Sequence, residues 1–204
     1  MAGNSKITKE LMDVLFAELN ELLAADNKNL ELVLCGGAVM VIYEVRHQTD
    51  DFDNIKLISS EYYKYFEVLQ SKYNLEYDWL NDRAEEMVPF HLPYEEWKQY
   101  SHLVVNKLTD EAMLAAKLKA CRAKDEQDIE FFIRRLQIAD KKAVENLCLK
   151  YGVPITEDMR NLHEMFKNID DEEERRYLIR EEQRLRAETK KRIAIINKLF
   201  NELK

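Results

Sequence analysis

A short apolar run that ends in two glycines constrains the fold of this chain more than any other feature. Residues 30 to 34 are almost all aliphatic, and Cys35, Gly36 and Gly37 follow directly. The run predicts a buried strand that breaks at the glycines, followed by a helix over residues 38 to 43. Two glycines at such a turn let the backbone approach a ligand closely, and the free N–H groups at a helix start attract phosphate. The segment therefore predicts a strand–turn–helix unit that can hold an anion.

An Asp-x-Asp pair stands at the start of a second predicted strand, residues 52 to 58. Because side chains alternate along a strand, the carboxylates of Asp51 and Asp53 project from one face. Mg²⁺ bound by few carboxylates and by triphosphate oxygens is the usual arrangement for nucleotidyl transfer. Each signal alone has a plainer explanation. Gly-Gly is mostly just a turn, an Asp-x-Asp in an acidic sequence is mostly a solvated strand end, and Arg46 and Thr49 fit surface positions.

The remaining periodicity predicts more helices than strands. An apolar stripe with Thr8 as its N-cap predicts a helix over residues 8 to 25. Ser60 is expected to cap a second helix, and Thr109, followed by two acids, to open a third that runs to about residue 123. Weaker patterns predict strands over residues 75 to 80, 87 to 92 and 102 to 108.

Lys117 lies on the apolar face of its predicted helix, where a charge is costly. It either extends its ammonium group to solvent or meets an anion, and the pattern leaves both open. Asp125 is interpreted as the cap of the next helix. Asp128 would then lie in the first turn of that helix, where the dipole alone favours an acid.

Composition excludes several classes of protein. The formal net charge of -8 argues against a protein that coats nucleic acid, although a local basic groove remains compatible with it. The three cysteines are widely spaced and fit reduced intracellular thiols. The first residues contain no apolar signal core, and no run is long enough to span a membrane. We therefore expect a cytoplasmic protein that does not bind membranes.

The last part of the chain is expected to be helical. Glycine and proline together number only seven, and Glu and Lys or Arg recur at four-residue spacing over residues 171 to 204. This pattern predicts a long, solvent-facing helix that could hold a partner protein or a second copy of the chain. We expect a first domain over residues 1 to 138 and a helical region over residues 139 to 204.

Two sequence blocks together resemble the nucleotidyltransferase superfamily. The first is G-G-A-x-x-x-I-x-x-x-R-x-x-T-x-D-x-D, from residue 36 to residue 53, and the second is L-A-A-K-L-x-A-x-R-x-K-D-x-x-D-I, from residue 114 to residue 129. The resemblance covers roughly residues 30 to 136. It is closer to bacterial members grouped with abortive-infection and toxin–antitoxin nucleotidyltransferases.

The resemblance implies an α+β fold, with a small mixed sheet flanked by helices and a helical C-terminal extension. It also implies a function: Mg²⁺-dependent transfer of a nucleotide from a nucleoside triphosphate to a tRNA end, a protein hydroxyl or a small molecule. It assigns roles to particular residues. Gly36, Gly37, Arg46 and Thr49 would bind the nucleotide, Asp51 and Asp53 the metal, Lys117 would neutralise charge on the leaving pyrophosphate, and Asp128 would be a later catalytic acid.

Two departures from the superfamily pattern keep other functions open. Gly37 replaces a serine that would supply a phosphate-binding hydroxyl, and a third metal-binding acid has only Asp78 and Glu76 as candidates, by position. A second hypothesis is therefore a catalytically inactive module that binds nucleotide or a partner protein. A third is a purely helical interaction protein in which the two short motifs are coincidental.

Overall fold

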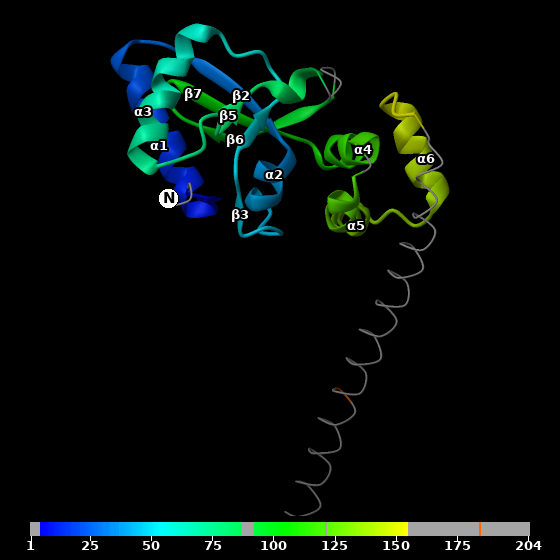
Figure 1. Ribbon diagram of the computed structural model, residues 1–204. Coiled ribbons are helices and arrows are strands. Elements are labelled where there is room, and N and C mark those ends of the chain that lie inside the picture. The colour runs from blue at the N-terminus through cyan, green and yellow to red at the C-terminus, as the bar shows by residue number, and fades with distance from the viewer. Residues whose placement is uncertain (1–4, 87–91, 121, 155–183, 185–204) are drawn as a thin grey trace, which may run out of the picture. The chain divides into compact units, whose positions relative to one another are not determined.

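The main element of the described fold is a five-stranded mixed sheet (Figure 1). The computed structural model describes residues 5–86, 92–120, 122–154 and 184. The central strand β2 is antiparallel to β4 and parallel to β7, and these neighbours carry the edge strands β5 and β6. In sheet order, the strands are β5 (Leu80–Asn81), β4 (Phe52–Asn54), β2 (Leu30–Cys35), β7 (Leu103–Leu108) and β6 (Tyr94–Gln99).

An aromatic core joins this sheet to the helices α1 (Lys9–Ala25) and α3 (Tyr63–Tyr73). Phe16 of α1 stacks on Phe52 of β4 with 5.1 Å between ring centroids. Trp79 is fully buried between Phe52 and Phe66 of α3, and its indole N–H donates to the Phe66 carbonyl. Burial of such large side chains is the main force that holds α1 and α3 together with the sheet.

The remaining helices follow the sheet strands along the chain. The helix α2 leaves β2 directly, α4 follows β7, and α4 packs against both α5 and α6. The α-helices are α2 (Gly36–Ile42), α4 (Asp110–Ala120), α5 (Glu126–Arg135) and α6 (Lys141–Lys150), and the short 3-10 turns are η1 (Ser60–Tyr62), η2 (Arg83–Glu86) and η3 (Ala123–Asp125).

A second, two-stranded sheet pairs the beginning of the chain with the segment before the acid pair. Strand β1 (Ile7–Thr8) is antiparallel to β3 (Gln48–Thr49), with Ile7 opposite Thr49. Ile7 is fully buried, and Thr8 also accepts a hydrogen bond from the Leu11 amide as the N-cap of α1. The pair thereby fixes both the start of α1 and the position of Thr49.

The structure confirms the predicted α+β class with a small mixed sheet flanked by helices. The helix expected over residues 8 to 25, the strand over 30 to 34 and the strand over 102 to 108 are present, and Thr109 caps α4 through the Ala112 amide. The five-stranded sheet shows that the purely helical alternative is wrong.

Two expected strands are shorter than predicted. The strand expected over residues 52 to 58 ends at Asn54, because the Asn54 side chain accepts from the Val33 amide and donates to the Lys56 carbonyl, which turns the chain away. The strand expected over 75 to 80 forms only at Leu80–Asn81. The expected cap role of Ser60 is wrong, because Ser60 is the first residue of η1, and Ser59 at the N-cap position makes no capping hydrogen bond. The strand expected over 87 to 92 lies almost wholly outside the described residues.

Contacts divide the chain into two compact units, Met1–Met159 and Arg160–Lys204. Helix α6, which prediction places with the C-terminal region, belongs to the first unit and packs on α4. The helix expected over residues 171 to 204 lies outside the described residues apart from Arg184. Among the helices that the structure describes, none is long and apolar enough to cross a membrane.

Candidate nucleotide-binding site

The two glycines after β2 form a tight corner, which we call the glycine corner (Gly36 and Gly37). Gly36 has a φ of 63°, a conformation that side chains rarely adopt, and a Cβ there would lie 2.7 Å from Asp53 Oδ2. A Cβ at Gly37 would lie 2.5 Å from Thr49 Oγ1. A side chain at Gly36 would be strained by the backbone, and at either position a Cβ would have to displace a carboxylate or hydroxyl oxygen.

Asp51 and Asp53, the acid pair, stand at the start of β4. Asp53 is directly opposite Cys35 in the antiparallel ladder, so its side chain lies beside the glycine corner. Phe52 points to the opposite face, into the aromatic core. The alternation of one short strand thus anchors the sheet on one side and presents a carboxylate on the other.

Electrostatics indicate that the acid pair lacks full compensation for its charge. Burial raises the pKa of Asp51, and the negative charge of Asp53 raises it further. Burial also raises the pKa of Asp53, although Arg83, Arg122 and Lys117 act in the opposite direction. Two half-buried acids with raised pKa values stand side by side here, and a bound cation would neutralise their charge.

The neighbourhood of the third predicted metal ligand is different. Asp78 Oδ2 lies 2.5 Å from Arg83 Nη2, and the same nitrogen lies 3.8 Å from Asp51 Oδ2. Asn81, an amide, stands opposite Asp53 in the parallel ladder with β5. Within the described parts of the chain, no three His, Cys, Asp or Glu side chains converge as metal ligands. The role predicted for Asp78 stays a prediction, and Glu76 likewise joins no such group.

A pocket of about 380 Å³ opens beside the glycine corner. Its wall combines one acid, small apolar side chains and several cations from α4 and the segment after it. The lining residues are Cys35, Gly36, Asp53, Ala84, Met113, Ala116, Lys117, Lys119, Ala120 and Arg122. Cations that attract an anion thus line the pocket together with small residues, and its volume suits a ligand of nucleotide size.

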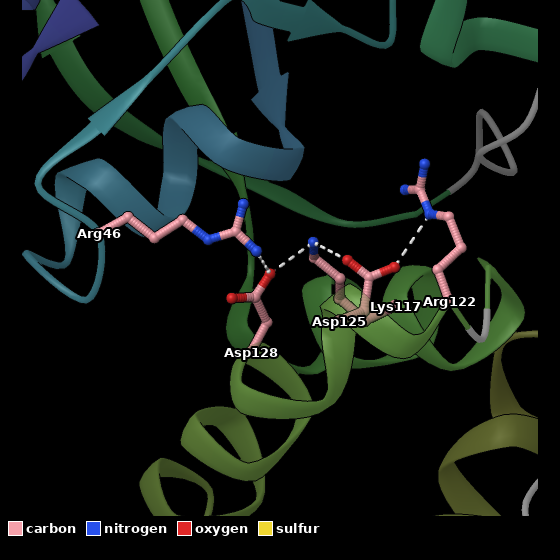
Figure 2. A network of polar contacts seen from close by, with 5 residues as sticks. All are labelled: Arg46, Lys117, Arg122, Asp125 and Asp128. Atoms are coloured by element: carbon pink, nitrogen blue, oxygen red, sulfur yellow. Dashed lines mark hydrogen bonds and ion pairs between the residues drawn. The ribbon is translucent and has the colours of Figure 1, made fainter.

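A chain of alternating charges, which we call the charge chain, includes two of the residues that line this pocket, Lys117 and Arg122 (Figure 2). Lys117 Nζ lies 2.7 Å from Asp125 Oδ1 and 2.6 Å from Asp128 Oδ2. Each aspartate holds a second cation: Arg122 Nε lies 3.0 Å from Asp125 Oδ2, and Arg46 Nη2 lies 2.7 Å from Asp128 Oδ2. The charge chain consists of Arg46, Asp128, Lys117, Asp125 and Arg122, and it connects the segment after α2 with α4, η3 and α5.

The charge chain answers the question that the sequence left open for Lys117. Its side chain is buried and meets two carboxylates, so it does not extend to solvent. The interpretation of Asp125 as a helix cap is wrong in its chemistry. It stands at the N-cap position of α5 but makes no capping hydrogen bond, because its carboxylate binds Lys117 and Arg122. Burial raises the pKa of Asp125, but these two partners outweigh burial and leave the pKa below its ordinary value.

The structure brings most of the predicted site residues together. Gly36 and Asp53 share the pocket, Gly37 contacts Thr49, and Arg46 Nη1 lies 3.9 Å from the position of a Gly37 Cβ. Asp128 does not join the acid pair but lies buried in the charge chain, and its predicted catalytic role stays a prediction.

Sequence reasoning missed Arg122, Arg83 and Asn81 as neighbours of the acid pair. Arg122 lies within the second motif block, but nothing in its spacing distinguishes it from a surface residue. A signal did exist for Asp125, since a lysine on an apolar helix face requires a buried anion nearby. The partner of Asp53 on β5 depends on strand pairing between distant segments, which periodicity does not reveal.

Comparison with known proteins supports one assignment. No curated protein and no solved structure matches the chain. A family described as "Nucleotidyltransferase of unknown function (DUF6036)" matches residues 9–139, which covers α1 through α5 and the whole candidate site. More than half of the chain lies within this match, and the fold agrees with it. The chain belongs to this family of nucleotidyltransferases.

Proposed function

We propose that this protein transfers a nucleotide from a nucleoside triphosphate to an acceptor hydroxyl with the help of Mg²⁺. The observation that carries the proposal is the contact between the glycine corner and the acid pair. Asp53 Oδ2 occupies the space in front of Gly36, and both residues line one pocket with Lys117 and Arg122. A cation beside Asp53 would therefore lie next to the backbone that a triphosphate can approach.

The donor atoms fit a hard cation. Asp51 and Asp53 offer carboxylate oxygens, which Mg²⁺ prefers, and their mutual repulsion without a cation favours binding of one. When bound, Mg²⁺ would polarise the phosphoryl group and neutralise charge on the leaving pyrophosphate. The acid pair would hold the ion, and one of its carboxylates would accept the proton of the acceptor hydroxyl.

The other residues of the site would bind and orient the nucleotide. Gly36 and Gly37 allow close approach of phosphate oxygens, and the Thr49 hydroxyl and Arg46 lie beside Gly37. Arg46 is about one-third exposed, so part of its guanidinium group can face a ligand while Asp128 holds it. These groups replace the serine hydroxyl that the sequence lacks at position 37.

The test is label transfer from each α-³²P-labelled nucleoside triphosphate with Mg²⁺. Wild-type protein should label an acceptor, and Asp51→Asn combined with Asp53→Asn should reduce the rate at least about 100-fold, because the charge that holds the metal is lost. Glu67→Gln combined with Glu96→Gln is the matched control, since it removes two exposed negative charges outside the pocket. Unchanged turnover in the Asp51/Asp53 variant would place the metal site elsewhere.

The acceptor is tested in the same assay by three separate additions: total tRNA, a protein lysate and small hydroxyl compounds. The net charge of -8 disfavours an extended RNA footprint, because phosphate contacts need clustered Lys and Arg. A tRNA end or a protein hydroxyl therefore fits better than a long RNA. Labelling of a protein whose gene neighbours that of this chain would support the toxin–antitoxin role.

One observation favours a second candidate, a catalytically inactive module that binds nucleotide. An amide, Asn81, stands beside Asp53 on β5, and the described residues offer no third carboxylate to complete the site. Such a protein would bind triphosphate and Mg²⁺ in equilibrium dialysis and transfer no label to any acceptor. Asn81→Asp tests this candidate further: a gain of transfer activity would identify the amide as the missing acid.

A further inference from the structure

The position of Lys117 within the charge chain limits what this residue can do for a ligand. Its ammonium group lies between two carboxylates that are each 1 % exposed, and its own side chain is 7 % exposed. Rotation of the ammonium toward a phosphate would break two buried ion pairs at once and leave each carboxylate with only its arginine, which is unfavourable. Lys117 is thus a buried counter-ion, although it contributes to the pocket wall.

Arg122 has the opposite character at the end of the same chain. Its side chain is 53 % exposed, and it lines the pocket that also contains Asp53. Only Nε is bonded to Asp125, and Figure 2 shows the two terminal nitrogens on the far side of the guanidinium group from that aspartate. Among the described residues, these terminal nitrogens have no ion-pair partner. A guanidinium group held by one edge presents its other edge as a planar fork, which matches phosphate oxygens.

We propose that Arg122, and not Lys117, is the cation that contacts the phosphates of the nucleotide, and that Asp125 is the positioning residue that directs it into the pocket. This rests on the proposed function, since it names the ligand contact within the same site. Asp125 itself is held by Lys117, so the buried lysine acts on the ligand only through the aspartate and the arginine. The buried Lys117–Asp125 ion pair therefore fixes the Asp125 carboxylate, and that carboxylate fixes the orientation of the exposed arginine.

The pocket wall supplies the electrostatic setting for this contact. Arg122 and Asp53 both line the pocket, and the positive charge of Arg122 opposes the rise that burial causes in the pKa of Asp53, so the two side chains share one electrostatic environment. An anionic ligand between them would gain from Arg122 and need a cation to shield it from Asp53. Inorganic tripolyphosphate is accordingly the simplest probe of the arginine, because it carries the phosphates without base or sugar.

The experiment measures binding and does not depend on turnover. Isothermal titration of wild type, Arg122→Gln, Arg122→Lys and the control Lys124→Gln uses tripolyphosphate, ATP and adenosine, each with Mg²⁺ and with EDTA. Lys124 is a matched control because it is an exposed cation two positions away and does not line the pocket. Circular dichroism and the melting temperature confirm that each variant is folded, which is expected because Arg122 is half exposed.

The expected result is a loss of about tenfold in affinity for tripolyphosphate and ATP in Arg122→Gln, the size of one charge-assisted contact at a partly exposed site. Affinity for adenosine should not change, and Lys124→Gln should bind like wild type. Arg122→Lys should be intermediate, because its single ammonium must serve both Asp125 and the phosphate.

Several outcomes would overturn the assignment. These are wild-type affinity for tripolyphosphate in Arg122→Gln, an equal loss in Lys124→Gln, or no binding of tripolyphosphate by the wild type.

Asp125→Asn tests positioning: it should lower affinity for tripolyphosphate in a folded protein, and addition of Arg122→Gln should cause little further loss. Losses that add in full would show that Asp125 acts independently of Arg122, which would overturn its role as a positioning residue. If Arg122→Gln lowers affinity as expected but the wild type transfers no label, Arg122 keeps its role in binding phosphate. Only the proposed catalytic function would then be refuted.

Discussion

At the residue scale, the glycine corner leaves little room for any side chain. A methyl group at Gly37 would lie 2.5 Å from Thr49 Oγ1 and 3.4 Å from Thr49 Cβ. The first distance is impossible without movement, and the second is close but tolerable. The hydroxyl of Thr49 therefore decides which residue can stand at position 37, and the two positions form one unit.

Gly37→Ala should destabilise the protein by about 1–3 kcal/mol, the usual cost of overpacking, as measured by urea unfolding. Thr49→Ala alone should cost less, because its hydrogen bond to the Asp51 carbonyl is 3.2 Å long and partly exposed. The double variant should recover part of the loss, since Thr49→Ala removes the clashing atom. Strict additivity of the two single changes would contradict this coupling.

At the element scale, strand β1 positions the segment that carries Thr49. Ile7 is fully buried and pairs with Thr49, Lys6 forms an ion pair with Asp50, and Lys9 lies 2.5 Å from Glu44. The family match begins at residue 9, so β1 lies outside it. The pairing nevertheless joins the beginning of the chain to the wall of the candidate site.

A chain that begins at Lys9 should lose amide protection in residues 46–50. Without β1, the backbone of β3 has no partner strand, and α1 loses its N-cap, which costs about 1 kcal/mol. Hydrogen exchange followed by mass spectrometry should show faster amide exchange in residues 46–50. Exchange in β7, which pairs with β2 and β6, should not change. Removal of residues 1–4 alone is the control and should leave exchange unchanged; equal protection of residues 46–50 in both truncations would contradict the role of β1.

The elements differ in how well the sequence predicts them, and the reason is physical. Strand β2 and helix α1 bury their apolar residues in a regular pattern, so periodicity finds them. Strand β6 escapes prediction because its sequence, Y-E-E-W-K-Q, is that of an exposed edge strand with no apolar face. The two-residue strands β1 and β3 depend only on each other. The local hydrophobic pattern of a sequence indicates which residues are buried, whereas the pairing of short or exposed strands depends on tertiary context.

The same distinction applies to the candidate site. The glycine corner and the acid pair are close in sequence, so the sequence predicts them together. The partners of Lys117 escape prediction, since a charge at one helix position does not say which acid will reach it. Local sequence favours Asp125 as a helix cap, but a buried ammonium needs counter-ions, and this need determines where the Asp125 carboxylate lies.

At the scale of the whole molecule, the acid pair connects stability, pH and metal binding. Burial raises the pKa values of Asp51 and Asp53 in the folded protein, and the negative charge of Asp53 raises that of Asp51 further. Between the ordinary and the raised pKa values, the folded state binds more protons than the unfolded state. Without metal, the contribution of these acids to stability is therefore present at low pH and is lost as the pH rises through the raised values.

Mg²⁺ should reverse this loss, because it binds the ionised acids of the folded state alone. The increase in melting temperature on addition of Mg²⁺ should be small near pH 4.5 and should grow as the pH rises, since protons compete with the metal for the same oxygens. At a Mg²⁺ concentration one hundred times the dissociation constant, the stabilisation is about 2.7 kcal/mol. Differential scanning fluorimetry at several pH values measures it.

The variant with Asp51→Asn and Asp53→Asn should be more stable than wild type at neutral pH without metal, because the repulsion is removed, and Mg²⁺ should not raise its melting temperature. The variant with Glu67→Gln and Glu96→Gln should respond to Mg²⁺ like wild type, which separates site binding from general screening of a chain with net charge -8. An equal response to Mg²⁺ in all three proteins would mean that the cation acts on the overall charge, and the acid pair would then not be a metal site.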